Sequence, residues 1–384
     1  MKNILVAGGG IGGTIVANRI AQKLGEEIRR GEVAVSVFDR SEHHYYQPGF
    51  LLVSMGVMEP EETSLPEREV LDRRVKLYSG DKGTVTKISV GDRQLTTADG
   101  SVYKYDVLVI ATGSHIQMDE VPGFSQGAET FFSLEGAKKM LKAVQSFSGG
   151  NIVVDVALLP HKCPVAPLEI TLMLDDYFRK KGIRDKVNIH YCYPIQGVFG
   201  IPNVNKMMLG LFESRGVNVH SQFTLASVDA ANRKIVSKEG EELRYDLLVA
   251  VPPHKGAQVI ADSGLGDRRN WVPTDKYTLR LKDHDDVYVM GDTTDIPISK
   301  AGSTADYESY TVAHNVAVDV KGDGSRKTYP GSVFCYIATG MDQATYIKFD
   351  YNNPPTPPTP SQIHWWGKLA YNKLYWSIHA RTLI

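Results

Sequence analysis

The first forty residues follow a regular order of apolar and polar positions. Residues 4–7 are continuously apolar, which predicts a strand buried on both faces. The following segment "TIVANRIAQKL" spaces its apolar residues as a helix does, and "VAVSVFDR" predicts a second strand that ends at Asp39. The pattern therefore predicts a strand, a helix and a parallel strand.

The turn between the first strand and the helix carries Gly8-x-Gly10-x-x-Gly13. Glycines let the backbone approach a pyrophosphate, and the N-terminus of the helix stabilises its negative charge. Asp39 follows at the distance at which an acid accepts a hydrogen bond from a ribose hydroxyl. Together these features predict a dinucleotide-binding unit; the alternative is a glycine turn that only packs the helix on the sheet.

Three later apolar runs end in turns. "YKYDVLVIATGS" (103–114) and "LRYDLLVAVPPH" (243–254) share a Tyr-Asp before the run, and "DVYVMGDTTD" (286–295) contains Gly291-Asp292. This order resembles the two-dinucleotide-binding-domain flavoproteins. The resemblance implies that the turn at Thr112 and Gly113 leads back towards the first domain and that Asp292 binds the ribitol of FAD.

We therefore expect an α/β fold with two Rossmann-like domains of the FAD/NAD(P)-linked reductase type, the second inserted in the first. The expected boundaries are 1–118 and 273–330 for the FAD-binding domain and 119–272 for the second domain. A C-terminal membrane-interaction extension would occupy 331–384 and contains "NNPPTPPTPSQ", whose prolines favour an extended, semi-rigid spacer.

Composition narrows the function classes. The chain has 384 residues, 42% of them hydrophobic, and a net charge of -1, so nothing favours a nucleic-acid partner. No run of eighteen apolar residues is present, and we interpret the N-terminus as the first strand, with no cleavable signal peptide. The three cysteines are too few for a disulfide scaffold and lack the paired spacing of a zinc site, so no metal is expected and redox chemistry is the reason to examine them.

The turn after the first strand of the second domain is unusual. Flavoenzymes that oxidise NADH carry a glycine loop there, whereas this chain reads "LLPHKCPVAPLE" (158–169). Proline has no N–H to offer a phosphate, and its ring keeps the backbone from closing around one. We expect that no NADH site exists and that another electron donor is used.

Cys163 lies in this turn, just before a predicted helix. The helix dipole and the neighbouring His161 and Lys162 favour a thiolate, which predicts a reactive cysteine; the alternative is a buried structural cysteine. Cys335, in "GSVFCYIATG", taken alone is typical of a small hydrophobe in a strand, and Cys192 is expected to be structural.

The motifs in this order resemble the sulfide:quinone oxidoreductases and, as a close relative, the flavin subunit of flavocytochrome c sulfide dehydrogenase. The resemblance covers essentially the whole chain. It is carried by the N-terminal glycines, "ATGS" (111–114), Cys163-Pro-x-x-Pro-x-Glu169, "YFRKKG" (177–182), Gly291-Asp292, Lys300-Ala301-Gly302, Cys335 and "WGKLAY" near the C-terminus.

The resemblance implies a redox disulfide between Cys163 and Cys335 on the substrate face of FAD. Hydrosulfide would attack it, Cys163 would carry the sulfur, and Cys335 would add to the flavin C4a. Glu169 would move the sulfide proton; its alternative role is a carboxylate that satisfies the start of the helix. Many members carry a further cysteine near the position of Phe124, and its absence here predicts noncovalent FAD.

The C-terminal segment has an apolar stripe, formed by Ile363, Trp366, Ala370, Leu374 and Ile378 and broadened by Trp365, Leu369 and Trp376. No acidic residue follows Asp350, whereas Lys368, Lys373 and Arg381 are basic. This composition predicts a helix that lies in the headgroup region of a membrane; the alternative is a cap on the core or on a dimer partner. The resemblance also implies that Lys368 approaches the flavin and that Tyr336 and Tyr371 sandwich a quinone ring.

The leading hypothesis is a peripheral membrane protein that oxidises sulfide to zero-valent sulfur or polysulfide and reduces membrane quinone. The alternatives are a sulfide dehydrogenase that passes electrons to a cytochrome, a type II NADH:quinone dehydrogenase, and a noncatalytic flavin-binding membrane protein. The sequence leaves open the sulfur product, the quinone type, the side of the membrane and whether the chain forms a homo-oligomer.

Overall fold

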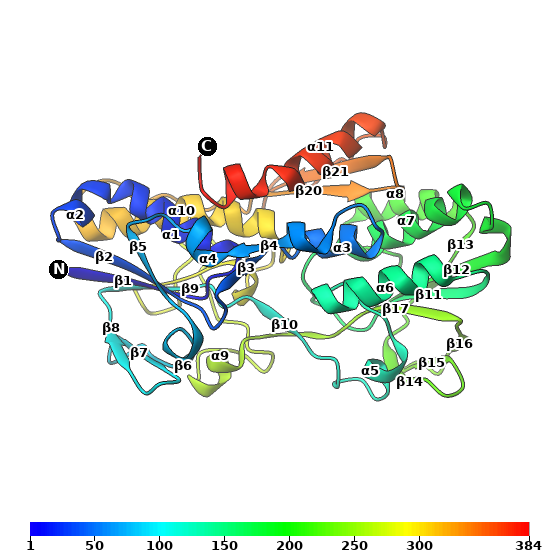
Figure 1. Ribbon diagram of the computed structural model, residues 1–384, viewed down its shortest axis with the longest axis horizontal. Helices are drawn as coiled ribbons and strands as arrows, with labels where there is room; N and C mark the ends of the chain where they lie inside the picture. The colour runs from blue at the N-terminus through cyan, green and yellow to red at the C-terminus, as the bar shows by residue number, and fades with distance from the viewer. Residues whose placement is uncertain (384) are drawn as a thin grey trace.

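A computed structural model describes residues 1–383 of the chain and contains two parallel sheets (Figure 1). The strand order in the first sheet is β19-β9-β1-β2-β5. Its members are β1 (Lys2–Ala7), β2 (Val33–Phe38), β5 (Val75–Tyr78), β9 (Val107–Ile110) and β19 (Val287–Val289), and every pairing is parallel. The apolar run of β1 is continuous because both faces of this sheet are covered.

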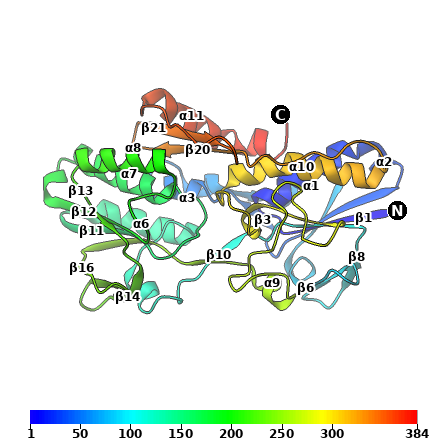
Figure 2. The same cartoon turned by 180° about the vertical axis from the view of Figure 1, so that it is seen from behind.

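One face of the first sheet is covered by helices α1 (Ile11–Lys23) and α10 (Gly302–Lys321), which pack side by side (Figure 2). The other face is covered by the antiparallel sheet of β6 (Val85–Ser89), β7 (Gln94–Thr97) and β8 (Val102–Lys104), together with α9 (Gln258–Asp262). Shorter elements complete this half of the molecule: α2 (Gly25–Arg29), β3 (His43–Tyr45), α3 (Gly49–Ser54), β4 (Ser64–Pro66) and α4 (Glu67–Val70).

The second sheet repeats the arrangement of the first. Its parallel strands run in the order β13-β12-β11-β17, namely β11 (Gly150–Val156), β12 (Val187–Tyr193), β13 (Val217–Ser221) and β17 (Leu247–Val251). The layers around it are α6 (Leu134–Ser146), α7 (Ala166–Lys180) and α8 (Pro202–Ser214), and the short elements α5 (Phe124–Gly127), β14 (Leu225–Asp229), β15 (Lys234–Ser237) and β16 (Glu242–Arg244). Two Rossmann-like domains are therefore present, as the sequence predicts.

An antiparallel strand pair joins the two domains, formed by β10 (Ser114–Ile116) on the way out and β18 (His254–Gly256) on the way back. The second domain is thus inserted in the first. The chain returns to the first domain earlier than the expected residue 273, because Ala257, Ile260 and Val272 lie in one apolar core with Leu5. Residues 257–272 accordingly pack with the first domain.

The C-terminal part forms a hairpin of β20 (Val333–Ala338) and β21 (Ala344–Phe349), followed by α11 (Gln362–Lys373) and a short π-helical turn (Tyr375–His379). In Figure 1 these elements lie along the upper edge of the molecule, next to α7. The proline-rich segment does not separate α11 from the hairpin, since Ser361 and Ala344 exchange two backbone hydrogen bonds. Trp365 is buried in the same core as Ile337 and the helix α7.

Only part of the predicted apolar stripe lies on the outer side of this C-terminal part, because Trp365 is buried and Leu369, Trp376 and Ile378 are partly buried. Ile363, Trp366 and Leu374 are 68%, 58% and 44% exposed, and Ala370 is exposed as well. None of the helices within residues 1–383 combines the length and the apolar character needed to cross a bilayer.

Candidate active site

The turn between β1 and α1 has the geometry that a bound dinucleotide needs. A Cβ atom at Gly13 would lie 1.8 Å from the carbonyl oxygen of Gly8, and Gly8 itself has a φ of +105°, so both positions require glycine. A Cβ at Gly10, in contrast, would have no atom of residues 1–383 within 4 Å. The free space beside Gly10, at the N-terminus of α1, fits a pyrophosphate.

Asp39 follows β2 and lies against this turn. Its Oδ2 accepts a hydrogen bond of 2.6 Å from the N–H of Gly9, and its Oδ1 accepts one of 2.8 Å from the N–H of Ser41. Burial raises the pKa of Asp39, while these two N–H groups act in the opposite direction. The carboxylate is thereby fixed beside the dinucleotide turn, where the sequence places a ribose contact.

Five further predicted cofactor residues lie at or next to the carboxyl ends of β9 and β19, namely Thr112, Gly113, Gly291, Asp292 and Lys300. The N–H of Gly113 donates to Thr293, and the Ser114 hydroxyl donates to Asp292 Oδ2 at 2.7 Å. Lys300 donates from Nζ to the carbonyl oxygens of Asp292 (2.9 Å) and Thr294 (2.6 Å). In parallel sheets a ligand binds at this edge, so these residues fit the flavin side of the site, with Lys300 holding the Asp292 turn in place.

A buried acid that the sequence analysis missed supports the same turn. Glu308, on α10, accepts a hydrogen bond from the N–H of Gly291 and is fully buried. Burial raises its pKa to about 8, although the Gly291 N–H and Lys300 act in the opposite direction. The only signal for it in the sequence is an acid on a mostly apolar helix face, which does not reveal its partner.

Both candidate redox cysteines line one cavity between the two domains and the C-terminal part, which we call the cysteine cavity. The predicted site residues that line it are Cys163, Glu169, Gly302, Cys335, Tyr336, Lys368 and Tyr371. Cys163 comes from the turn after β11 and Cys335 from β20, and both are free thiols. The fold thus brings together two residues that are far apart in the sequence.

Each cysteine is held by a residue next to the start of α10. The N–H of Cys163 donates to the carbonyl oxygen of Lys300 at 2.6 Å, and Cys163 adopts a φ of +51°, which is unusual for a residue with a side chain. The Sγ of Cys335 lies 3.6 Å from Oγ of Ser303. The two cysteines are therefore anchored to neighbouring residues of the first domain, Cys163 through its backbone and Cys335 through its sulfur atom.

The expected thiolate-favouring environment of Cys163 is wrong. Burial raises the pKa of Cys163 and raises that of Cys335 to about 11, so both are protonated thiols at neutral pH. Burial also lowers the pKa of His161 to about 4, which leaves this imidazole uncharged. Lys368 acts in the opposite direction on both thiols, so it is the cation that a released thiolate would find.

His161 lies in the turn after β11, which has no glycine loop. Its Nδ1 donates to the carbonyl oxygen of Lys162, and its ring packs against Phe132 and His254, with the two imidazole centroids 6.1 Å apart. His161, His254 and Phe132 are all buried. The three rings thus pack together beside this turn, which has no glycine between residues 158 and 169.

Glu169 and Lys368 form a buried ion pair at the cysteine cavity. Lys368 Nζ donates to Glu169 Oε1 at 2.6 Å, and the backbone N–H of Ala338 donates to the same oxygen at 2.6 Å. The Glu169 side chain is 3% exposed and that of Lys368 is 11% exposed. Glu169 is thus more than a carboxylate at the start of a helix, since it binds the Cys335 hairpin and α11 together.

The two tyrosines predicted to bind a quinone lie near each other but are not parallel. The ring centroids of Tyr336 and Tyr371 are 6.4 Å apart, and the ring planes are inclined by 61°. A planar ring held between them therefore requires one tyrosine to turn.

Cys192 lies away from the cysteine cavity. It is fully buried in the core of the second domain, opposite Asp155 in the β11–β12 register.

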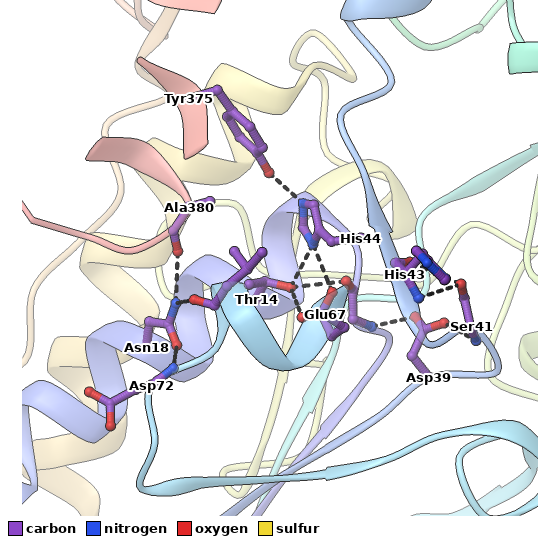
Figure 3. Close-up of polar contacts among 12 residues, drawn as sticks. Thr14, Asn18, Asp39, Ser41, His43, His44, Glu67, Asp72, Tyr375 and Ala380 are labelled. Atoms are coloured by element: carbon purple, nitrogen blue, oxygen red, sulfur yellow. Dashed lines mark hydrogen bonds and ion pairs between the residues drawn. The ribbon is translucent and has the colours of Figure 1, made fainter. Parts of the chain in front are cut away.

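A buried polar network ties the C-terminal turn to the first domain (Figure 3). His44 is fully buried; its Nδ1 donates to Glu67 Oε2 at 2.9 Å, so its Nε2 accepts from the hydroxyl of Tyr375 at 2.6 Å. Thr14, the residue after Gly13, donates to the other Glu67 oxygen at 2.6 Å. The end of the chain is thus connected to the dinucleotide turn through side chains that the sequence analysis did not single out.

The fold has counterparts among known proteins. A family model described as pyridine nucleotide-disulphide oxidoreductase matches residues 2–317. The chain belongs to this family.

Two relatives and one solved structure show the same likeness. The mitochondrial sulfide:quinone oxidoreductase of Mus musculus is 28% identical over 368 residues, which cover 93% of this chain and 80% of that protein. The protein of the same name from Dictyostelium discoideum is 28% identical over 361 residues, covering 91% and 78%. The solved sulfide:quinone oxidoreductase of Aquifex aeolicus matches with a TM-score of 0.87 at 21% identity, covering 99% of this chain and 92% of that one.

These findings confirm two predictions, the resemblance to the sulfide:quinone oxidoreductases and the two-domain fold. The chain is accordingly an oxidoreductase of a flavin-dependent kind.

The buried Glu308 generates a prediction about stability and pH. Its pKa is raised from 4.5 to about 8 in the folded protein, so the folded state keeps a proton that the unfolded state has lost. The stability that this provides is fully present below pH 4.5 and is lost as the pH rises through about 8. The measurement is thermal unfolding of the flavin-loaded protein. As the pH rises from about 5 to about 8, the parent should lose stability while Glu308→Gln does not, so the Tm of the variant should rise relative to that of the parent. An unchanged difference in Tm across this range would contradict the prediction.

Proposed function

We propose that this protein is a peripheral membrane sulfide:quinone oxidoreductase that uses FAD and a Cys163–Cys335 redox disulfide. The observation that carries the proposal is the cysteine cavity, where two cysteines from distant segments lie beside a buried lysine. The likeness to proteins named sulfide:quinone oxidoreductase supports the choice of sulfide as donor and quinone as acceptor.

FAD would be held by the β1–α1 turn, Asp39, the Thr112–Gly113 turn, Asp292, Lys300, Gly302 and Lys368. When bound, it supplies two-electron acceptance and release between the donor and the acceptor. The space beside Gly10 and Gly113 would accommodate the cofactor, and the lack of a cysteine near the position of Phe124 supports binding without a covalent bond. None of the three cysteines is assigned to a covalent bond with the flavin: Cys163 and Cys335 line the cysteine cavity, and Cys192 is buried in the second domain.

In the proposed sulfide step, the sulfur of HS⁻ attacks Cys163 Sγ in the disulfide form. A new S–S bond forms at Cys163, the Cys163–Cys335 bond breaks, and its electron pair leaves with Cys335 as a thiolate. Lys368 and the Ser303 hydroxyl both lower the pKa of Cys335, so they stabilise this leaving group.

The role we propose for Glu169 differs from that of a free base. Its Oε1 already accepts hydrogen bonds from Ala338 and Lys368, so it holds the ammonium group of Lys368 beside both sulfur atoms. Loss of its charge would leave Lys368 buried without a partner, which is costly in a low-dielectric site. We propose that Glu169 acts by positioning Lys368.

The acceptor side is best explained by a quinone at a membrane surface. The cysteine cavity has aromatic walls at Phe334, Tyr336 and Tyr371, and the exposed apolar stripe lies on the same C-terminal elements. A lipid-soluble acceptor would reach the cavity from a membrane that this stripe contacts. The alternative acceptor is a cytochrome. The exposed apolar side chains of Ile363 and Trp366 favour the quinone over it, because they suit contact with a membrane.

The first test follows the flavin absorbance under anaerobic conditions. We expect sulfide to bleach the flavin rapidly and added decylubiquinone to restore it. NADH should leave the flavin oxidised within the time of normal turnover, because the turn that would bind its pyrophosphate has no glycine, and His161, His254 and Phe132 pack beside it. Bleaching by NADH but not by sulfide would favour a type II NADH dehydrogenase and would refute the proposal.

The second test separates the three cysteines. Cys163→Ser and Cys335→Ser should each retain flavin but lose sulfide oxidation by at least about 100-fold, since each removes one half of the disulfide. Cys192→Ser is the matched control and should stay close to the parent, because Cys192 is fully buried in another core. If both Cys163→Ser and Cys335→Ser turn over sulfide within about tenfold of the parent, roughly 1.4 kcal/mol in the barrier, the disulfide mechanism is wrong.

The third test concerns the membrane. The double variant Ile363→Ser and Trp366→Ser removes two exposed apolar side chains, and we expect its binding to phosphatidylcholine–phosphatidylglycerol vesicles to fall on the order of tenfold. Its reduction of a short-chain quinone in solution should change little, because neither residue lines the cysteine cavity. Val102→Ser, which alters a 54% exposed residue on β8, is the control. Equal vesicle binding by the parent and the double variant would refute the membrane role of the stripe.

A further inference from the structure

The cysteine cavity contains a histidine–aspartate pair that neither the motifs nor the proposed sulfide step uses. His379, from the π-helical turn, and Asp306, from α10, both line the cavity. His379 Nδ1 lies 3.0 Å from Asp306 Oδ2, and Arg19 donates to Asp306 Oδ1 at 3.0 Å. The carboxylate thus bridges an imidazole and a guanidinium.

His379 also reaches solvent. Its side chain is 24% exposed, in contrast to His44, which is fully buried. Among residues 1–383, no hydrogen bond to His379 Nε2 is present, so this nitrogen is available to a ligand or a water molecule. His379 is therefore the imidazole that has one side in the cavity and one side towards water.

The other ionisable groups around His379 have fixed partners or hold their protons. The Tyr371 ring lies 4.5 Å from the imidazole, centroid to centroid, and burial raises the pKa of Tyr371. Burial likewise raises the pKa of Tyr375, whose hydroxyl donates to His44, and Lys368 is paired with Glu169. Arg19 lies over the Tyr310 ring and is paired with Asp306.

We propose that His379 is the proton donor to the quinone, an inference that rests on the proposed function. Forming a quinol from a quinone takes two electrons and two protons; bound reduced flavin would supply both electrons and one of the protons, so one further proton is needed. In the proposed step the Nε2–H bond of the His379 imidazolium breaks and an O–H bond forms on the quinone oxygen. The neutral imidazole keeps its Nδ1–H on Asp306 and regains a proton from water at its exposed side.

Asp306 and Arg19 are positioning residues in this arrangement. The carboxylate holds the Nδ1 tautomer and orients the ring, as an acid does for a general acid–base histidine. Arg19 occupies the second oxygen of the carboxylate and keeps it in place.

The test uses the holoenzyme reduced anaerobically with one equivalent of dithionite, so that it does not depend on the sulfide step. Reoxidation is followed after mixing with decylubiquinone or with ferricyanide, which accepts electrons without a proton. His379→Asn can keep a hydrogen bond to Asp306 but has no titratable nitrogen. We expect its reoxidation by quinone to slow on the order of 100-fold and to depend less on pH than that of the parent, because asparagine does not titrate. Reoxidation by ferricyanide should stay within about twofold of the parent.

The control is His314→Asn, which alters a partly exposed histidine of α10 that bonds the carbonyl oxygen of Ser325 and does not line the cavity. It should match the parent with both acceptors. A His379→Asn variant with the parent's quinone rate and pH profile would overturn the inference, as would an equal loss with both acceptors, which would mean that the turn has only a structural role. A parent enzyme that sulfide bleaches but quinone does not reoxidise would instead overturn the proposed acceptor, and the inference with it.

Discussion

One oxygen atom, Oε1 of Glu169, is the junction on which the arrangement of the candidate active site depends. It accepts hydrogen bonds from the hairpin that carries Cys335 and from Lys368 on α11, while Glu169 itself belongs to the helix that follows Cys163. Removing one partner of a buried ion pair typically costs about 3–5 kcal/mol, because the other charge stays buried alone. The relative position of the two cysteines is therefore coupled to the docking of the C-terminal helix.

The C-terminal helix combines two different surfaces. Trp365 is buried in the core with α7, whereas its neighbour Trp366 is 58% exposed. The inward side carries Lys368 and Asn372, and the outward side carries the exposed part of the apolar stripe. A helix of this kind can present an apolar surface to the outside while its other side stays packed in the core.

The sequence was sufficient where local geometry determines the structure. Gly13 and Gly8 are predictable because a side chain at either position collides with the backbone or requires a rare φ, and the buried strands follow from continuous apolar runs. The family resemblance also predicted that Cys163 and Cys335 lie at the same site. These features depend on residues close in the sequence or on several motifs in a fixed order.

The sequence was insufficient where the environment of a side chain depends on distant segments. His161 and Lys162 next to Cys163 suggest positive charge, but the fold packs His161 between Phe132 and His254 and leaves it neutral. Glu308 and the His44–Glu67 pair were missed for the same reason, because their partners lie far away along the chain or are backbone groups. The early return at residue 257 was missed because the first domain accepts Ala257 and Ile260 into its core without any change in composition.

The link between Tyr375 and His44 has a consequence for biosynthesis. These residues are separated by 331 positions, and Asn18, in the first helix, donates to the carbonyl oxygen of Ala380 across 362 positions. During translation the N-terminal segments leave the ribosome first and begin to fold first. Until residues 375–380 have emerged, the polar groups of His44 and Asn18 lack these partners. The first domain is synthesised first but completes its side-chain contacts last. A nascent chain would therefore expose its dinucleotide turn before residues 375–380 have packed against His44 and Asn18.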